Sequence, residues 1–333
     1  MATVGIEHRA RTHRTVLTAA LAAATLTASL TAGCTRHAPA DDSRTPPRPP
    51  APTRSVTAAA ALGSPLVVKI DNVRAARPQT GLDTADIVYA EQVEGGLSRL
   101  MAVYATQLPK SVGPVRSARE SDLELLRQFD QPTLAFSGAQ RRLLPLIRRA
   151  PVRAESPDEA ADAYYRGRGR AAPHNLYLRP DRLLATAPGP AALTTGFHYG
   201  PAPSGGTPET SRIVRYPATR FTFTWSARRS GWLVAMDDTP AVSADGARPA
   251  PATVVLQYVN LRSSAYSDVL GNRTPYTETV GSGRAEVLRD GRSFDATWAR
   301  PSATGGTSFT AADGSRMNFA EGQVWVVFVP TRS

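Results

Sequence analysis

The sequence predicts an α+β protein in which a mixed α/β N-terminal half packs on a β-rich C-terminal half, with one layered sandwich as a variant of this arrangement. Strand-like and helix-like segments alternate up to residue 188, whereas β-branched and aromatic runs without an amphipathic helix follow residue 211. A stretch rich in Gly and Pro separates the two halves. A composition that is 41% hydrophobic and 20% charged excludes a polytopic membrane protein and a wholly disordered chain.

The N-terminus has the pattern of a secretory signal peptide. Three arginines, Arg9, Arg11 and Arg14, precede residues 16–32, which contain no charge and are rich in Ala, Leu and Thr. Residues 1–33 are therefore predicted to direct secretion and to be removed. The apolar run is too short and too rich in Ala and Thr to favour a permanent spanning helix.

The only cysteine, Cys34, follows small residues at the expected cleavage site. This arrangement resembles a bacterial lipobox, in which the cysteine sulfur is acylated, although Thr31 stands where Leu is usual. We expect Cys34 to be lipidated and to anchor the protein on the outer side of the cell membrane. The alternative is simple cleavage that leaves a free thiol. A single cysteine also excludes an intramolecular disulfide and a cysteine-based zinc site.

Residues 34–64 are predicted to be the lipidated cysteine and a disordered tether. Six prolines alternate there with Ser, Thr, Arg and Ala, so that little apolar surface is available to order the segment. The tether would hold the folded part of the protein away from the lipid.

The chain is basic, with 39 Lys and Arg against 28 Asp and Glu and a formal net charge of +11. Only Lys69 and Lys110 are lysines, and such a preference for Arg is typical of codon usage in a GC-rich genome. The other interpretation is attraction to an anionic component of the cell envelope, such as lipid head groups or phosphate-bearing polymers. Nucleic acid is not an expected partner, because no helix-turn-helix, zinc finger or aromatic and basic RNA-binding pattern is present.

Residues 65–188 form the predicted mixed α/β half. β-branched and aromatic runs predict three strands, at 66–70, 85–89 and 97–108. Apolar residues on one face predict two helices, at 120–129 and 143–147. A further helix is expected to begin at Ser156, because Ser, Pro and Glu occupy its N-cap, first and third positions.

Residues 189–210 are expected to connect the halves, and residues 211–330 form the predicted β-rich half. Its strands are expected at 221–225, 232–236, 253–259, 285–288, 293–298 and 324–329. Asp290-Gly291 and Asp313-Gly314 predict tight turns between strands. We expect the halves to pack as one body, because each offers only a limited core of its own.

Six short blocks follow one another in the first half: Ile70-Asp71-Asn72, Arg77–Leu82, Ala85–Tyr89, Val93–Arg99, Gly113–Arg119 and Ala172–Tyr177. Together with Asp290-Gly291-Arg292 and Thr297-Trp298, these blocks resemble the YerB-like bacterial lipoproteins, a family of domains of unknown function. The family pattern has an acid directly after the Tyr of its second strand, whereas this chain has Ala90 there and Glu91 one position later. The resemblance implies an extracytoplasmic lipoprotein with two closely packed domains and no established reaction.

Arg116 and Arg119 lie three residues apart, at the entrance to the helix predicted near Glu120. Two planar guanidinium groups beside the N–H groups of a helix start predict a clamp for phosphate or carboxylate. The alternative is that both arginines pair with Asp86, Glu91 or Glu94 and so hold strands to a loop.

Other polar residues near strand ends and turns are candidates for chemistry. Glu94 and His174 are the candidates for proton transfer, and Asp71, Asn72 and Asn175 are candidates for ligand contacts beside the arginines. Pro173 stiffens the loop that carries His174. The spacing of these residues forms no recognised metal motif, and no cofactor is predicted. Ordinary turn and salt-bridge roles are the alternative for all of them.

The chain lacks the Gly-x-Ser-x-Gly and His-Glu-x-x-His motifs of known hydrolases. The first functional interpretation is a membrane-tethered binding or accessory module that recognises an anionic envelope component. The second is an envelope phosphoryl or glycan transferase or hydrolase, with Arg116 and Arg119 neutralising substrate charge and Glu94 or His174 moving a proton. The third is a structural partner of another envelope protein. A cleft that gathers these four residues would distinguish the first two from the third.

Overall fold

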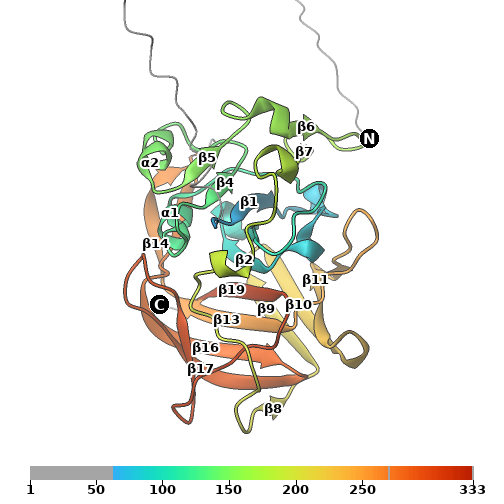
Figure 1. Ribbon diagram of the computed structural model, residues 1–333, viewed down its shortest axis with the longest axis vertical. Coiled ribbons are helices and arrows are strands. Elements are labelled where there is room, and N and C mark those ends of the chain that lie inside the picture. Colours follow the sequence, from blue (N-terminus) through green and yellow to red (C-terminus); the bar gives the residue numbers. More distant parts are fainter. Residues whose placement is uncertain (1–62, 269–270, 332–333) are drawn as a thin grey trace, which may run out of the picture. The chain divides into compact units, whose positions relative to one another are not determined.

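The computed structural model describes residues 63–268 and 271–331 (Figure 1). The predicted signal peptide, Cys34 and all but the last two residues of the predicted tether lie outside these ranges. The described chain contains two α-helices, α1 (Glu120–Leu126) and α2 (Leu144–Arg149). Its strands are β1 (Leu66–Asp71), β2 (Ile87–Gln92), β3 (Ser98–Tyr104), β4 (Thr133–Ala135), β5 (Arg153–Glu155), β6 (Tyr164–Arg166), β7 (Leu176–Leu178), β8 (Thr207–Pro208), β9 (Ser211–Tyr216), β10 (Thr219–Ser226), β11 (Gly231–Met236), β12 (Thr239–Pro240), β13 (Thr253–Val259), β14 (Leu261–Ser267), β15 (Arg273–Thr277), β16 (Gly281–Arg289), β17 (Arg292–Arg300), β18 (Ser308–Ala311) and β19 (Val324–Pro330).

The prediction of an α+β fold with a mixed α/β N-terminal half is wrong, because the described chain is β-rich in both halves. The two predicted helices exist as α1 and α2 but are only seven and six residues long. The helix expected at Ser156 is a single turn, in which the Ser156 carbonyl accepts hydrogen bonds from the N–H groups of Glu159 and Ala160 at 3.0 and 2.9 Å. The chain then enters β6, and the pairing of β6 with β7 replaces a continued helix.

Both halves of the chain contribute strands to one large sheet. Its strands follow the order β18-β17-β16-β13-β19-β2-β3-β1-β4-β5, and β8 pairs with β17. The last strand, β19, runs parallel to both of its neighbours, with Val324 opposite Thr253 of β13 and Ile87 of β2. The C-terminal half therefore supplies the strand that joins the two halves.

A second sheet, in the order β12-β11-β10-β9, packs against one face of the large sheet. Phe221 and Phe223 alternate along β10 with more exposed threonines, as expected for a strand with one buried face. Both rings meet the edge of Trp325 in β19, with centroids 6.5 and 6.0 Å away. Aromatic side chains thus fill the space between the sheets.

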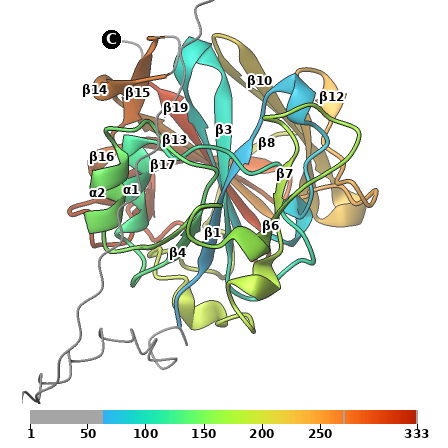
Figure 2. The same cartoon turned by 90° about the horizontal axis from the view of Figure 1, so that it is seen from above.

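The two α-helices lie on the opposite face of the large sheet, as Figure 2 shows with α1 and α2 on one side and β10 and β12 on the other. Leu126 of α1 and Ile147 of α2 are buried in the same cluster as Tyr89 and Met101 of the sheet. This packing brings the start of α1 to the ends of β1 and β2, where the candidate site is found.

The turn predicted at Asp290-Gly291 is confirmed and joins β16 to β17, with Arg289 opposite Arg292. Asp290 and Gly291 have φ values of 52° and 69°, and positive φ at both central residues is what a type I′ hairpin turn requires. Asp313-Gly314 also forms a turn, closed by a 3.0 Å hydrogen bond from the Gly314 N–H to the Ala311 carbonyl.

Candidate functional site

Charged side chains replace apolar ones at one end of the large sheet. The register of the strands places Asp71 of β1 opposite Arg99 of β3, and Arg99 opposite Glu91 of β2. Because residues directly opposite each other share a face, these three charges form a row across three strands. Lys69 lies two residues before Asp71 in β1 and therefore points to the same face.

Lys69 is completely buried between two carboxylates. Its Nζ donates hydrogen bonds to Glu91 and, at 2.6 Å, to Asp122 Oδ1 of α1. Burial raises the pKa of Glu91 to about 7, and the nearby Asp122 carboxylate contributes to this shift. Two buried carboxylates therefore share one ammonium group beneath α1, and burial favours the protonated form of Glu91.

Asp71 forms ion pairs with two arginines and lies beside one histidine. Its carboxylate lies 3.3 Å from Arg99 Nη1, 3.2 Å from Arg116 Nε and 2.8 Å from His174 Nδ1. The Asp71 side chain is fully buried, whereas those of Arg116 and His174 are each 24% exposed. The structure therefore brings together Asp71, Arg116 and His174, which belong to three separate sequence blocks.

Arg119 pairs with Glu94 rather than standing free. Arg119 Nε and Nη2 donate to the two oxygens of Glu94 at 2.7 and 2.9 Å. The Arg119 backbone N–H donates to Asp122 Oδ2 at 2.7 Å, which caps the short helix α1. The ion-pair interpretation of this arginine therefore describes its contacts, and the start of α1 is occupied by its own capping carboxylate.

A cavity of about 540 Å³ opens beside this network. Three guanidinium groups line it, from Arg99, Arg116 and Arg119, together with the carboxylates of Glu94 and Glu120. The β14–β15 hairpin contributes Tyr266, Ser267, Asp268, Asn272 and Thr274 to the lining, so a third acidic residue also borders the cavity. The sequence candidates Arg116, Arg119 and Glu94 thus converge on one solvent-accessible space, whereas His174 does not line it and is linked to Arg116 only through Asp71.

The side chains of Asn72 and Asn175 make hydrogen bonds to neighbouring loop and strand residues instead. Asn72 Nδ2 donates to Ser98 Oγ at 2.8 Å, and its Oδ1 accepts from Gln79 Nε2 at 2.7 Å. Asn175 Nδ2 donates to the Arg170 carbonyl at 3.0 Å, and its Oδ1 accepts from Arg166 Nη1 at 2.9 Å. Neither side chain lines the cavity.

Lys69, Arg99 and Asp122 belong to the network but were not identified as site residues from the sequence. Lys69 carried a usable signal, because it interrupts the β-branched run Leu66–Ile70 and a lysine inside a buried strand needs a carboxylate partner. Arg99 and Asp122 had no such signal, since their contacts depend on strand register and on the placement of α1.

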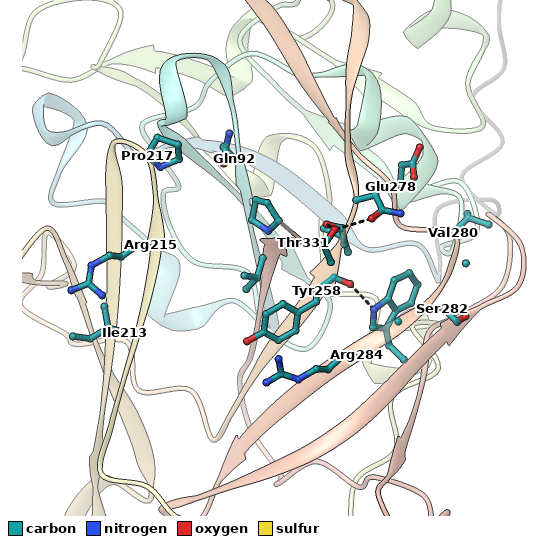
Figure 3. Close-up of a pocket in the computed structure, with 17 residues that line it drawn as sticks. Gln92, Ile213, Arg215, Pro217, Tyr258, Glu278, Val280, Ser282, Arg284 and Thr331 are labelled. Atoms are coloured by element: carbon teal, nitrogen blue, oxygen red, sulfur yellow. Dashed lines mark hydrogen bonds between the residues drawn. The ribbon is translucent and has the colours of Figure 1, made fainter. Parts of the chain in front are cut away.

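A second cavity, of about 890 Å³, lies where the parallel strands β2, β19 and β13 end (Figure 3). Tyr258 and Arg284 lie in its wall, with the guanidinium 4.5 Å from the centre of the Tyr258 ring. Both side chains also contact Glu286. None of the candidate residues from the sequence lines this cavity.

Within the described residues, no group of three His, Cys, Asp or Glu side chains is arranged to hold a metal ion. In the same part of the chain, no helix has the length and apolar character needed to cross a bilayer.

Comparison with known proteins places the chain in a family. Residues 52–192 match "Protein of unknown function (DUF3048) N-terminal domain", and residues 212–326 match the corresponding C-terminal domain. The protein belongs to this DUF3048 family and contains both of its domains. The resemblance to the YerB-like lipoproteins is thereby confirmed.

The YerB protein of Bacillus subtilis is similar to this chain both in sequence and in structure. "Putative lipoprotein YerB" of strain 168 is 33% identical over 123 residues, a segment that makes up 37% of this chain and 37% of that protein. The crystal structure of the YerB protein matches with a TM-score of 0.67 at 20% identity, over 82% of this chain and 93% of that one. The aligned segment spans little more than a third of the curated relative, and the structural match shows a shared fold.

Proposed function

We propose that the protein is a membrane-tethered extracytoplasmic module that binds an anionic component of the cell envelope in the cavity lined by Arg99, Arg116 and Arg119. One observation carries this proposal. The Arg116 guanidinium lines the cavity and, among the described residues, has no hydrogen-bond acceptor, since its Nε lies 3.2 Å from Asp71 without hydrogen-bond geometry. The N–H groups of the Arg116 guanidinium are therefore available to a ligand that offers two oxygens, such as phosphate or carboxylate.

The balance of charge around Asp71 also favours an anion. Asp71 is the one carboxylate within 4 Å of both Arg99 and Arg116 in the described chain, and His174 shares it. Burial, together with repulsion from Arg116 and Arg119, lowers the pKa of Arg99 in spite of Asp71. An anion bound at Arg116 would relieve this repulsion and would gain charge-assisted hydrogen bonds.

The location proposed for the protein rests on its N-terminus. Residues 1–33 have the features of a signal peptide, and Cys34 stands where lipid would be attached. The similar Bacillus subtilis protein is named a putative lipoprotein, which supports the same anchoring here. In the proposed arrangement Cys34 holds the protein on the outer surface of the cell membrane, near anionic head groups and polymers. Cell fractionation tests this part, because a high-salt wash, which screens attraction between surface charges, should release Cys34→Ser from the membrane but not the wild type.

Titration calorimetry with inorganic phosphate tests the cavity. The wild type should bind phosphate, and Arg116→Gln should weaken binding roughly tenfold or more, as expected for the loss of charge-assisted hydrogen bonds. The affinity of Arg116→Lys for phosphate should be intermediate, because lysine keeps the positive charge but cannot donate two parallel hydrogen bonds. Arg182→Gln, at an exposed position outside the cavity, is the control and should bind as the wild type does. Equal affinities of wild type and Arg116→Gln would contradict the proposal.

The contact between His174 and Asp71 favours an envelope hydrolase or transferase as a second candidate function. His174 Nδ1 lies 2.8 Å from Asp71, and its Nε2 has no hydrogen-bond partner among the described residues. A carboxylate on one ring nitrogen orients the other as a proton acceptor. Glu94 is unsuited to donate a proton at neutral pH, because hydrogen bonds from Arg119 and Thr274 outweigh burial and lower its pKa. Assays with phosphomonoesters and cell-wall glycans, comparing wild type with His174→Gln, test this candidate.

A further inference from the structure

A basic and partly apolar surface surrounds helix α2, on the outer side of the cavity. We define this α2 surface by Arg127, Arg141, Arg142, Leu146, Arg148 and Arg149, all of which are exposed. We propose that the α2 surface rests directly on an anionic phospholipid bilayer. This inference extends the membrane attachment of the proposed function, but it concerns a surface that the proposed function does not use.

The charge of the α2 surface is not neutralised within the protein. None of its five guanidinium groups makes an ion pair or a side-chain hydrogen bond with another described residue. The whole segment 131–154 contains five arginines and no acidic residue. Two exposed arginines elsewhere, Arg262 and Arg284, have carboxylate partners, whereas Arg228 and Arg229 are exposed without one and form only a pair. An unpaired basic cluster attracts a surface that carries many negative charges.

An exposed leucine lies among these arginines. Helix α2 buries Ile147 against the sheet, and Leu143 before it is buried as well, which turns Leu146 outward. Leu146 is 41% exposed and is one of three large apolar side chains in the described chain that are exposed to this degree, the others being Tyr199 and Ile213. A leucine surrounded by arginines matches the interface of a bilayer, where head groups meet the cations and acyl chains accept the apolar group.

The described chain begins at the same end of the large sheet at which the α2 surface lies. Ser64 Oγ donates to the Asp130 carbonyl at 2.6 Å, and the Thr133 N–H donates to the Pro65 carbonyl at 3.0 Å. β4 pairs with β5, and β5 begins four residues after α2 ends. Arg127, which belongs to the α2 surface, directly follows the last residue of α1. The chain that leads back toward Cys34 therefore leaves the folded part beside the α2 surface.

The proposed lipid and the α2 surface are two separate attachments. A lipid on the N-terminal side anchors the chain, and the basic surface adds a second attachment that depends on charge. The α2 surface would orient the protein, whereas the tether alone leaves its orientation free. The cavity shares Gln140 and Leu143 with the segment around α2, so docking would bring the cavity close to the head groups.

Vesicle flotation tests the proposal with the chain from Thr35 onward, which contains every described residue and no thiol. The probes are vesicles of phosphatidylcholine alone and of phosphatidylcholine with phosphatidylglycerol. The protein should float only with the anionic vesicles. Arg148→Gln/Arg149→Gln should weaken this binding on the order of 30-fold, since each Arg near an anionic surface contributes about a factor of five. Arg228→Gln/Arg229→Gln removes the same charge from an exposed pair elsewhere and should bind as the wild type does.

A fluorescent label supplies the second measurement. Leu146→Cys provides the only thiol, and a polarity-sensitive dye there should report an apolar environment when anionic vesicles are added. Ile213→Cys, at a position that is 44% exposed and lies on β9, is the matched control and should show no change. The proposal is overturned if the wild type does not bind anionic vesicles, or if both double arginine variants lose binding equally. It is also overturned if the dye at position 146 reports an aqueous environment after vesicles are added, or if the protein binds soluble polyphosphate more tightly than the vesicles. None of these readouts depends on Cys34 or on phosphate in the cavity, so failure here is distinct from failure of the proposed function.

Discussion

Arg119 holds Glu94 side-on, with Nε and Nη2 donating to the two carboxylate oxygens at 2.7 and 2.9 Å. Thr274 of β15 donates to the same carboxylate at 2.5 Å. Glu94 follows β2, Arg119 precedes α1 and Thr274 belongs to the C-terminal half, so one carboxylate connects three distant segments of the chain. This contact explains why an arginine expected to bind ligand also contributes to the fold.

Replacing Arg119 should therefore reduce stability. Arg119→Gln leaves the Glu94 carboxylate largely buried without its cation, and the free energy of unfolding should fall by about 3 kcal/mol. Urea denaturation measures the change. Glu94→Gln/Arg119→Gln should recover part of the loss, because no unpaired charge remains. A change below about 0.5 kcal/mol, the size expected for Arg148→Gln on the surface, would contradict a structural role for the pair.

Glu91 should make stability depend on pH near neutrality. Its pKa in the folded protein is raised to about 7 by burial and by Asp122, above the value of an unfolded carboxyl. Between those two pKa values the folded state binds the extra proton, so this group's contribution to stability is present at acidic pH and is lost as pH rises through 7.

Glu91→Gln removes that titration and leaves the Lys69–Asp122 pair in place. The wild type should therefore gain roughly 1 kcal/mol more than Glu91→Gln when the pH is lowered from about 8 to about 6. Thermal unfolding over this range, analysed as a free-energy difference between the two proteins, measures the effect. Parallel pH profiles for the two proteins would show that Glu91 does not titrate there.

The two Asp-Gly turns should respond differently to alanine. Gly291 has a φ of 69°, and a Cβ there would lie 2.9 Å from the Trp225 ring, whereas Gly314 has a φ of 83° and nothing within 4 Å of its Cβ position. Gly314→Ala should cost about 1 kcal/mol from backbone strain alone. Gly291→Ala should cost about 2–3 kcal/mol, because the contact with Trp225 adds overpacking to the same strain. Equal losses in denaturant unfolding would mean that Trp225 moves aside freely.

Strands with a continuous β-branched composition were predictable from the sequence. β13 begins and ends at the residues expected, and the turn at Asp290-Gly291 was located because only a few residue types accept positive φ. The helical content was overestimated. Amphipathic spacing at 120–129 and a cap at Ser156 describe local preference, whereas the lengths of α1 and of the turn at Ser156 are limited by the neighbouring strands.

The candidate site was predictable where it depends on short spacing. Arg116, Arg119 and Glu94 were identified from residue types within short blocks of the sequence, and all three line the cavity. The roles of Lys69 and Arg99 depend on which residues stand opposite each other across β1, β3 and β2. A shift of one residue would turn each strand's side chains to the other face, and the sequence of a single strand does not determine that register.

The position of β19 has a consequence for how the protein reaches its native state. Both neighbours of this strand, β13 and β2, precede it in the chain, and the gap between them stays open until residues 324–330 are available. The large sheet therefore closes only when nearly all of the described chain is available, and neither half can complete it alone. Such an order of strands makes folding depend on contacts between residues far apart in the sequence, which form slowly.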